Sequence, residues 1–164
     1  MQKKCEKCGK MFEAKQEYYK VCYECNIAKQ SKNERGEKSL LSDLLLKSYF
    51  DEKGNLVKEI FLDIPDKIAK KLYQDHPSLK MKQLRDFYSI ISNARTSALL
   101  KGIDSVRSIL WQCATKLEYQ LKREIIPQSF VDFMRHHLKL AEKDEKHLDA
   151  FYQHLDSIVC YFPK

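Results

Sequence analysis

The longest uninterrupted helical pattern in this sequence runs from Lys80 to Lys101. The stretch contains neither Pro nor Gly, and Gly102 follows it. Apolar side chains recur along it at intervals of three and four residues, the spacing of one helix face; they are Leu84, Phe87, Tyr88, Ile91, Ala94 and Ala98. Such a helix has about six turns and extends about 33 Å. The pattern therefore predicts a long helix that can form the centre of a helical bundle.

Four further segments have helical periodicity and begin at residues that commonly start helices. These residues are Pro65, Asp104, Pro127 and Asp144, because proline fits the first turn and aspartate caps the N-terminus. The side chains expected to face inward include Ile68, Leu72, Tyr73, Val106, Leu110, Cys113, Leu117, Leu121, Phe130, Phe133, Met134, Leu138, Leu148, Phe151, Tyr152, Leu155, Ile158 and Val159. Turns of two to six residues join the segments. The chain is therefore expected to be mainly α, with an antiparallel bundle of about five helices.

The composition supports this fold class and limits the location of the protein. Only four Gly and four Pro occur in 164 residues, which favours helices over turn-rich β structure. No stretch approaches the roughly 18 consecutive apolar residues of a membrane span, and the charged N-terminus has no apolar segment typical of a secretory signal. A cytoplasmic, reducing location is therefore expected. Closely spaced cysteines in that setting are more often metal ligands than disulfides.

Two Cys-x2-Cys pairs, Cys5 with Cys8 and Cys22 with Cys25, are separated by thirteen residues. Two such knuckles can place four sulfur atoms tetrahedrally around Zn(II), with a hairpin between them. A helix-compatible segment follows Cys25, which favours a treble-clef zinc finger, although a zinc ribbon has a similar pattern. Four thiolates without a further ligand candidate predict a closed structural site rather than a catalytic one.

These patterns divide the chain into three parts. Residues 1–30 are expected to form the zinc-binding module. Residues 31–62 would be a linker with a short leucine-rich helix and a hairpin or turn at Lys53–Asn55. Residues 63–164 would form the helical bundle. Lysines surround the zinc module, which suits contact with either nucleic acid or a neighbouring protein.

The long helix also has a polar face with two cations, Lys82 and Arg85. Small polar residues follow them on the same side, namely Ser89, Ser92, Asn93 and Thr96. A phosphate backbone could approach this low, positive surface, or the face could simply be solvated. Arg95 instead projects near the apolar stripe, where a lone charge is costly. It therefore requires either a carboxylate partner or a groove that opens to a ligand.

The third predicted helix has a second basic face, in which Gln112, Lys116, Tyr119 and Arg123 are spaced four, three and four residues apart. Cations and an aromatic ring on one stripe could hold phosphates and stack on a base, or the stripe could be solvated. Trp111 lies beside the apolar stripe and fits a core or an interface.

The sequence contains no glycine-rich phosphate loop, no nucleophile in a recognisable motif and no H-E-x-x-H pattern. His136 and His137 are adjacent and so cannot face one site together on a helix; they are interpreted as surface or groove residues. We therefore expect no enzymatic activity.

The segment from about Leu62 to Phe162 resembles the small subunit of type III-A CRISPR effector (Csm) complexes. The similarity rests on Q-L-R-D-F-Y at Gln83–Tyr88, on the third helix rich in Leu, Tyr, Lys and Arg, on F-V-D-F-M at Phe130–Met134 and on F-Y-Q-H-L at Phe151–Leu155. This resemblance implies a helical, non-catalytic RNA-binding subunit. Copies of it would stack along the guide RNA–target RNA duplex beside the other subunits of the complex.

The family resemblance places target-RNA binding on Arg85 and on Lys116, Lys122 and Arg123 of the third helix. Together with the faces described above, the expected RNA-binding residues are Lys82, Arg85, Arg95, Lys116, Tyr119, Lys122 and Arg123. The formal net charge of +7 agrees with an anionic partner. The four-cysteine module is not expected in this family. The alternatives are therefore a zinc-ribbon regulator that binds nucleic acid, or a protein-interaction adaptor, each with a helical dimerisation domain.

Overall fold

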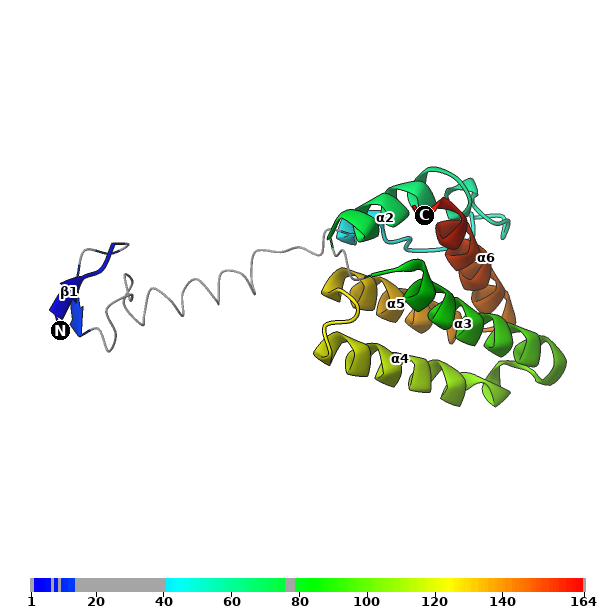
Figure 1. Cartoon of the computed structure of the whole chain (residues 1–164). Helices are drawn as coiled ribbons and strands as arrows, with labels where there is room; N and C mark the ends of the chain where they lie inside the picture. Colours follow the sequence, from blue (N-terminus) through cyan, green and yellow to red (C-terminus); the bar gives the residue numbers. More distant parts are fainter. Residues whose placement is uncertain (1, 7, 9, 14–40, 76–78, 164) are drawn as a thin grey trace. The chain divides into compact units, whose positions relative to one another are not determined.

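The computed structural model describes residues 2–6, 8, 10–13, 41–75 and 79–163. The chain divides into two compact units, Met1–Lys38 and Ser39–Lys164. In the first unit, β1 (Gln2–Lys4) and β2 (Met11–Glu13) form an antiparallel pair in which Lys3 lies opposite Phe12 (Figure 1). The described α-helices lie in the second unit.

The loop between β1 and β2 carries the first predicted cysteine pair. Cys5 is buried, and its backbone N–H donates to the carbonyl oxygen of Lys10 at 2.9 Å. Cys8 is exposed. The second pair, Cys22 and Cys25, lies outside the described residues. The strands therefore flank the first knuckle, and the structure does not test the four-cysteine site.

Five α-helices make up most of the described part of the second unit, which confirms the mainly helical prediction. They are α2 (Asp63–Asp75), α3 (Met81–Lys101), α4 (Arg107–Lys122), α5 (Gln128–Ala141) and α6 (Glu145–Tyr161). Three short 3-10 helices accompany them: η1 (Ser42–Leu44), η2 (Lys58–Ile60) and η3 (Ile103–Ser105). None of the helices in the described ranges is long and apolar enough to cross a membrane.

Helix α6 is the centre of the helical unit, since it packs against α2, α3 and α5 (Figure 1). Helix α4 packs against α3 and α5 and lies at the opposite edge from α2. The sequence identified α3 as the central helix because it is the longest. The structure gives that position to α6, because α6 packs against three other helices and α3 packs mainly against α6 and α4.

The buried side chains follow the predicted stripes closely. Leu84, Phe87, Ile91, Ala94 and Ala98 of α3 are all 0–2% exposed. Most of the inward residues expected on the other helices, among them Ile68, Leu110 and Phe151, are likewise buried. Four expected inward residues are only partly buried and pack against the core, namely Tyr88, Leu121, Tyr152 and Val159. Tyr73 was expected to face inward but is 50% exposed, and its ring packs edge-on against Phe162.

The ends of two helices test the capping predictions. At α6, the Asp144 carboxylate accepts a hydrogen bond from the backbone N–H of His147 at 2.8 Å, which confirms the predicted N-cap. At α4, the prediction was wrong: Asp104 lies within η3, and α4 begins at Arg107. The reason is Gly102, whose φ of 84° and ψ of 162° turn the chain into η3 before α4 can start.

The segment Leu41–Leu62 contributes to the core although its sequence resembles a linker. Leu41, Tyr49 and Ile60 are each fully buried. A tight turn within the segment is closed by a bridge between Phe50 and Leu56. The expected turn at Lys53–Asn55 is therefore present. The segment Leu41–Leu62 packs on the helices, and we call it the strap.

Histidines of α5 and α6 hold the strap. The Tyr49 hydroxyl and His137 Nδ1 are 2.6 Å apart, and His154 Nδ1 lies 3.0 Å from the carbonyl oxygen of Ile60. His136 Nε2 lies 2.7 Å from the carbonyl oxygen of Leu46. His137 was interpreted as a surface or groove residue, yet it is fully buried because it faces the strap.

Candidate nucleic-acid interface

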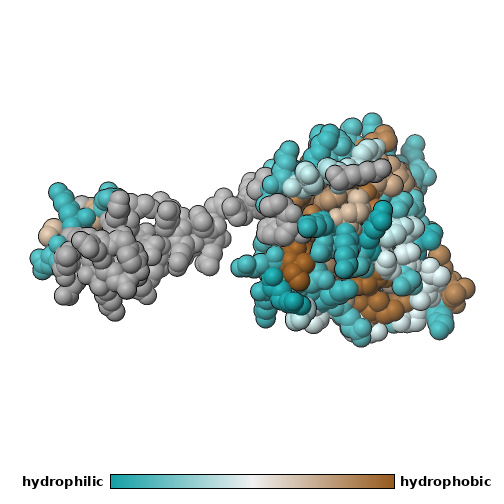
Figure 2. All heavy atoms as spheres, viewed as in Figure 1, coloured by the Kyte–Doolittle hydropathy of each residue, from teal (hydrophilic) through white to brown (hydrophobic). Residues whose placement is uncertain are grey.

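The predicted RNA-binding residues of α3 and α4 differ in exposure. Lys82 and Arg85 are exposed on α3, and Tyr119, Lys122 and Arg123 are exposed on α4. Hydrophilic side chains cover much of the displayed face of the helical unit, with hydrophobic patches between them (Figure 2). These five side chains are therefore on the surface, as the sequence predicted.

Ion pairs separate the described arginines into two groups. Arg95 pairs with Asp149, Arg107 with Asp104 at 3.3 Å, and Arg135 with Glu118 at 2.6 Å. Within the described ranges, Arg85 and Arg123 have no carboxylate partner. No carboxylate in the described part of the chain therefore compensates the charge of these two residues, and the planar guanidinium group suits a bidentate contact with phosphate.

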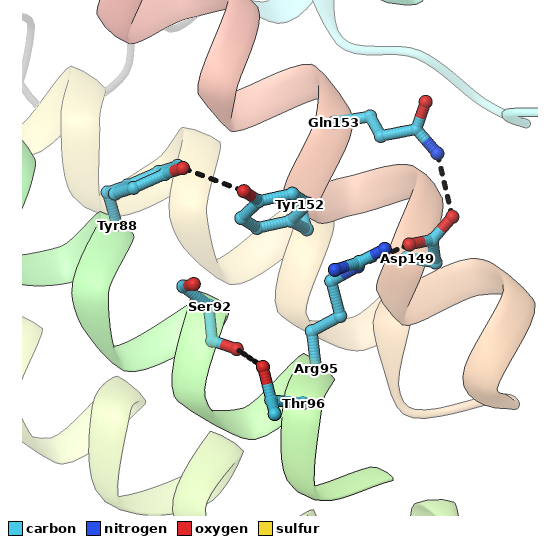
Figure 3. Close-up of polar contacts among 7 residues, drawn as sticks. All are labelled: Tyr88, Ser92, Arg95, Thr96, Asp149, Tyr152 and Gln153. Carbon is cyan, nitrogen blue, oxygen red and sulfur yellow. Dashed lines mark hydrogen bonds and ion pairs between the residues drawn. The ribbon is translucent and has the colours of Figure 1, made fainter. Parts of the chain in front are cut away.

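The half-buried Arg95 has a carboxylate partner, one of the two environments expected for it. Its Nε donates to Asp149 of α6, and the guanidinium carbon lies 4.7 Å from the centroid of the Tyr152 ring (Figure 3). The second carboxylate oxygen of Asp149 accepts from Gln153 Nε2 at 2.7 Å. The charge of Arg95 is therefore used to join α3 to α6.

Other polar groups between α3 and α6 also have partners within the protein. The hydroxyls of Tyr88 and Tyr152 are 2.8 Å apart (Figure 3). The hydrogen bond with Tyr152, burial and the nearby Asp156 raise the pKa of Tyr88, so its hydroxyl stays protonated. Thr96 donates its hydroxyl to the carbonyl oxygen of Ser92 at 3.1 Å. One hydroxyl of the predicted polar face is thus already engaged by its own helix.

On α4, the structure brings together two of the four residues in the predicted stripe. Arg123 Nη1 donates to the Tyr119 hydroxyl at 3.1 Å, and the guanidinium carbon lies 5.4 Å from the ring centroid. Lys116 is half-buried, and its ammonium group lies 5.5 Å from the centroid of the Phe87 ring of α3. Lys116 is therefore directed toward α3, while Tyr119 and Arg123 form a separate exposed pair.

Trp111 is 57% exposed on α4, so the core position is ruled out for it. Cys113, on the opposite side of the same helix, is buried as expected. Burial raises the pKa of its thiol to about 12, so the thiol is protonated at neutral pH. This cysteine has the character of a small core residue.

No group of three or more His, Cys, Asp or Glu side chains within the described ranges could hold a metal ion. Two of the four predicted zinc ligands, Cys22 and Cys25, lie outside those ranges. The zinc site therefore stays a prediction that rests on cysteine spacing.

The family model for Csm2 Type III-A matches residues 56–163. This span covers more than half of the chain and contains all five described α-helices. The chain belongs to the Csm2 type III-A family. The resemblance predicted from the helices is thereby confirmed, and this Csm2 protein is a small subunit of a type III-A CRISPR complex.

The match begins after the cysteine module and after most of the strap, including Tyr49. These N-terminal parts therefore lie outside the matched region. Neither the comparison with curated proteins nor the comparison with solved structures gave a match.

Proposed function

We propose that this Csm2 protein is a non-catalytic subunit that holds target RNA beside the guide RNA–target RNA duplex through the exposed cations of α3 and α4. The observation that carries the proposal is that Arg85 and Arg123 have no carboxylate partner within the described ranges. Lys82 and Lys122 are exposed close to them in sequence. Family membership supports a role within a type III-A complex, and these exposed cations support a contact with RNA.

The proposed contact is with the RNA backbone. Phosphate contacts carry no direct sequence information, so binding would depend on charge and shape. This suits an RNA-guided complex, in which base pairing with the guide reads the target sequence. Copies of the protein would stack along the duplex beside the other subunits, in the cytoplasm.

We also propose that Cys5, Cys8, Cys22 and Cys25 bind a structural Zn(II) ion. The support is the spacing of the two pairs and the β1–β2 hairpin, whose loop carries Cys5 and Cys8. Such a short segment lacks a core, so metal binding would supply most of its folding free energy, on the order of 10 kcal/mol. The module would dock on a neighbouring subunit or on nucleic acid.

Mild affinity purification from the native host tests the complex. We expect several larger proteins and short RNAs that share a constant end and have a variable remainder. A protein that is recovered alone, or with DNA, would instead favour the zinc-ribbon regulator. That alternative predicts selective binding to duplex DNA that disappears when a chelator removes the metal.

Charge substitutions test the RNA contact with a matched control. Arg85→Gln and Arg123→Gln should each weaken RNA binding for all sequences alike and lower the slope of log affinity against log salt by about 0.7 to 0.9. Arg95→Gln is the control, because Asp149 already neutralises Arg95; its salt slope should stay near that of the wild type. A loss confined to particular sequences would contradict backbone recognition.

A further inference from the structure

Tyr119 presents an aromatic surface that phosphate binding does not use. Its side chain is 59% exposed, and its ring contacts no other aromatic ring within the described ranges. Several other tyrosines do have ring partners: Tyr49 packs on His137, Tyr73 on Phe162 and Tyr88 on Tyr152. An exposed ring forgoes the stabilisation that burial provides. Tyr119 is therefore available to stack on something outside the chain.

Arg123 holds this ring in a defined orientation. It donates to the Tyr119 hydroxyl at 3.1 Å, while its guanidinium carbon lies 5.4 Å from the ring centroid. The two residues are four positions apart on α4, so they are neighbours on the helix surface. Because Arg123 has no carboxylate partner within the described ranges, its planar charged group is also available to a ligand. The pair thus combines an oriented ring with an uncompensated cation.

We infer that Tyr119 and Arg123 form a platform that stacks on an unpaired base of RNA. Every base has a π face, so such stacking tolerates any sequence. Bases inside a duplex already have both faces covered by their neighbours, which leaves unpaired bases as the partners. Arg123 would at the same time attract the adjacent phosphate. This inference rests on the proposed function and adds a preference for single-stranded RNA.

Three probes separate stacking from charge attraction in the full chain. Oligouridine carries phosphates and unstacked bases, a uridine–adenosine duplex carries phosphates with stacked bases, and polyphosphate carries charge without bases. Tyr119→Leu should weaken oligouridine binding about fivefold or more, as loss of one stacked base does. It should leave the binding of the duplex and of polyphosphate unchanged, along with the salt slope, because no charge is removed.

Two further variants define the roles of the pair. Tyr119→Phe keeps the ring and should keep most of the oligouridine affinity, whereas Arg123→Gln should weaken binding of all three probes. Tyr73→Leu is the matched control, because Tyr73 is 50% exposed on α2 and already has Phe162 as a ring partner. This control should bind oligouridine as the wild type does.

The outcomes separate the two proposals. The platform is wrong if Tyr119→Leu binds oligouridine as tightly as the wild type, or if it loses polyphosphate to the same extent as oligouridine. The first of these results would leave RNA binding through cations intact. If the wild-type chain bound none of the three probes, both the platform and the proposed RNA contact would be wrong.

Discussion

Acidification should destabilise the helical unit through the buried histidines that hold the strap. His154 is fully buried, and burial lowers its pKa to about 4, although the hydrogen bond to the Ile60 carbonyl opposes this change. Burial and the neighbouring His154 and His136 also lower the pKa of His137. Protonating either ring would place a charge in the core beside another histidine, without a carboxylate partner within the described ranges.

The magnitude follows from the difference in pKa between the folded and unfolded states. Between pH 6.5, the usual histidine value, and about pH 4, the unfolded chain binds a proton at His154 that the folded chain does not. The contribution of the neutral His154 to the free energy of unfolding is therefore fully present above pH 6.5 and is lost as the pH drops toward 4. At about 1.4 kcal/mol per pKa unit, His154 alone accounts for a loss of about 3 kcal/mol. His137 adds to the loss in the same direction.

Such a loss is large beside the roughly 5–15 kcal/mol of a typical domain, so urea unfolding can measure it. Far-UV circular dichroism at pH 7, 6, 5 and 4 would follow the helices and give the free energy of unfolding at each pH. His154→Asn removes the titrating group and retains an N–H donor for the Ile60 carbonyl. This variant should be less stable at pH 7, because the ring is lost, but its stability should fall less between pH 7 and pH 4.

A histidine that contacts the same strap serves as the control. His136→Asn removes a partly buried histidine that contacts the Leu46 carbonyl and leaves His137 and His154 in place. Its stability should still fall steeply as the pH decreases. The reasoning would be refuted if the wild type were equally stable at pH 7 and pH 4. It would also be refuted if His154→Asn lost stability with decreasing pH as steeply as the wild type.

Two further predictions concern the strap and the cysteine module. Tyr49→Phe should lower the free energy of unfolding by about 1–3 kcal/mol, since it leaves the buried Nδ1 of His137 without its partner; urea unfolding at pH 7 measures this, and an unchanged midpoint would contradict it. Elemental analysis should find one zinc per chain, and Cys22→Ser should lower that content while the helical circular dichroism is retained. A zinc-free wild-type chain would rule out the metal site.

Local sequence patterns predicted most of the helical unit. The stripe from Leu84 to Ala98 and the cap at Asp144 depend on residues a few positions apart, so their spacing is sufficient to identify them. The prediction of Asp104 as a helix N-cap was wrong because the residue types alone do not show how the backbone at Gly102 redirects the chain. The burial of the strap was also not predicted. Its apolar residues are scattered among charged ones, which is typical of a linker, and only the packed helices show that these residues are buried.

The exposed residues of the candidate site were also predictable from local patterns. Periodicity alone was enough to place Lys82, Arg85, Tyr119 and Arg123 on helix faces, and the Csm2 family was identifiable from helix motifs.

The amino-acid sequence by itself determined the helices, their buried faces and the basic character of two surfaces, because these depend on neighbours within a few residues. The tertiary structure decided which charges are compensated. Arg95 and Asp149 are 54 positions apart and form an ion pair, whereas Arg85 and Arg123 have no such partner within the described ranges. It also decided that His137 is a core residue held by Tyr49, 88 positions away. These contacts exist only once distant segments are packed together, and no local spacing encodes them.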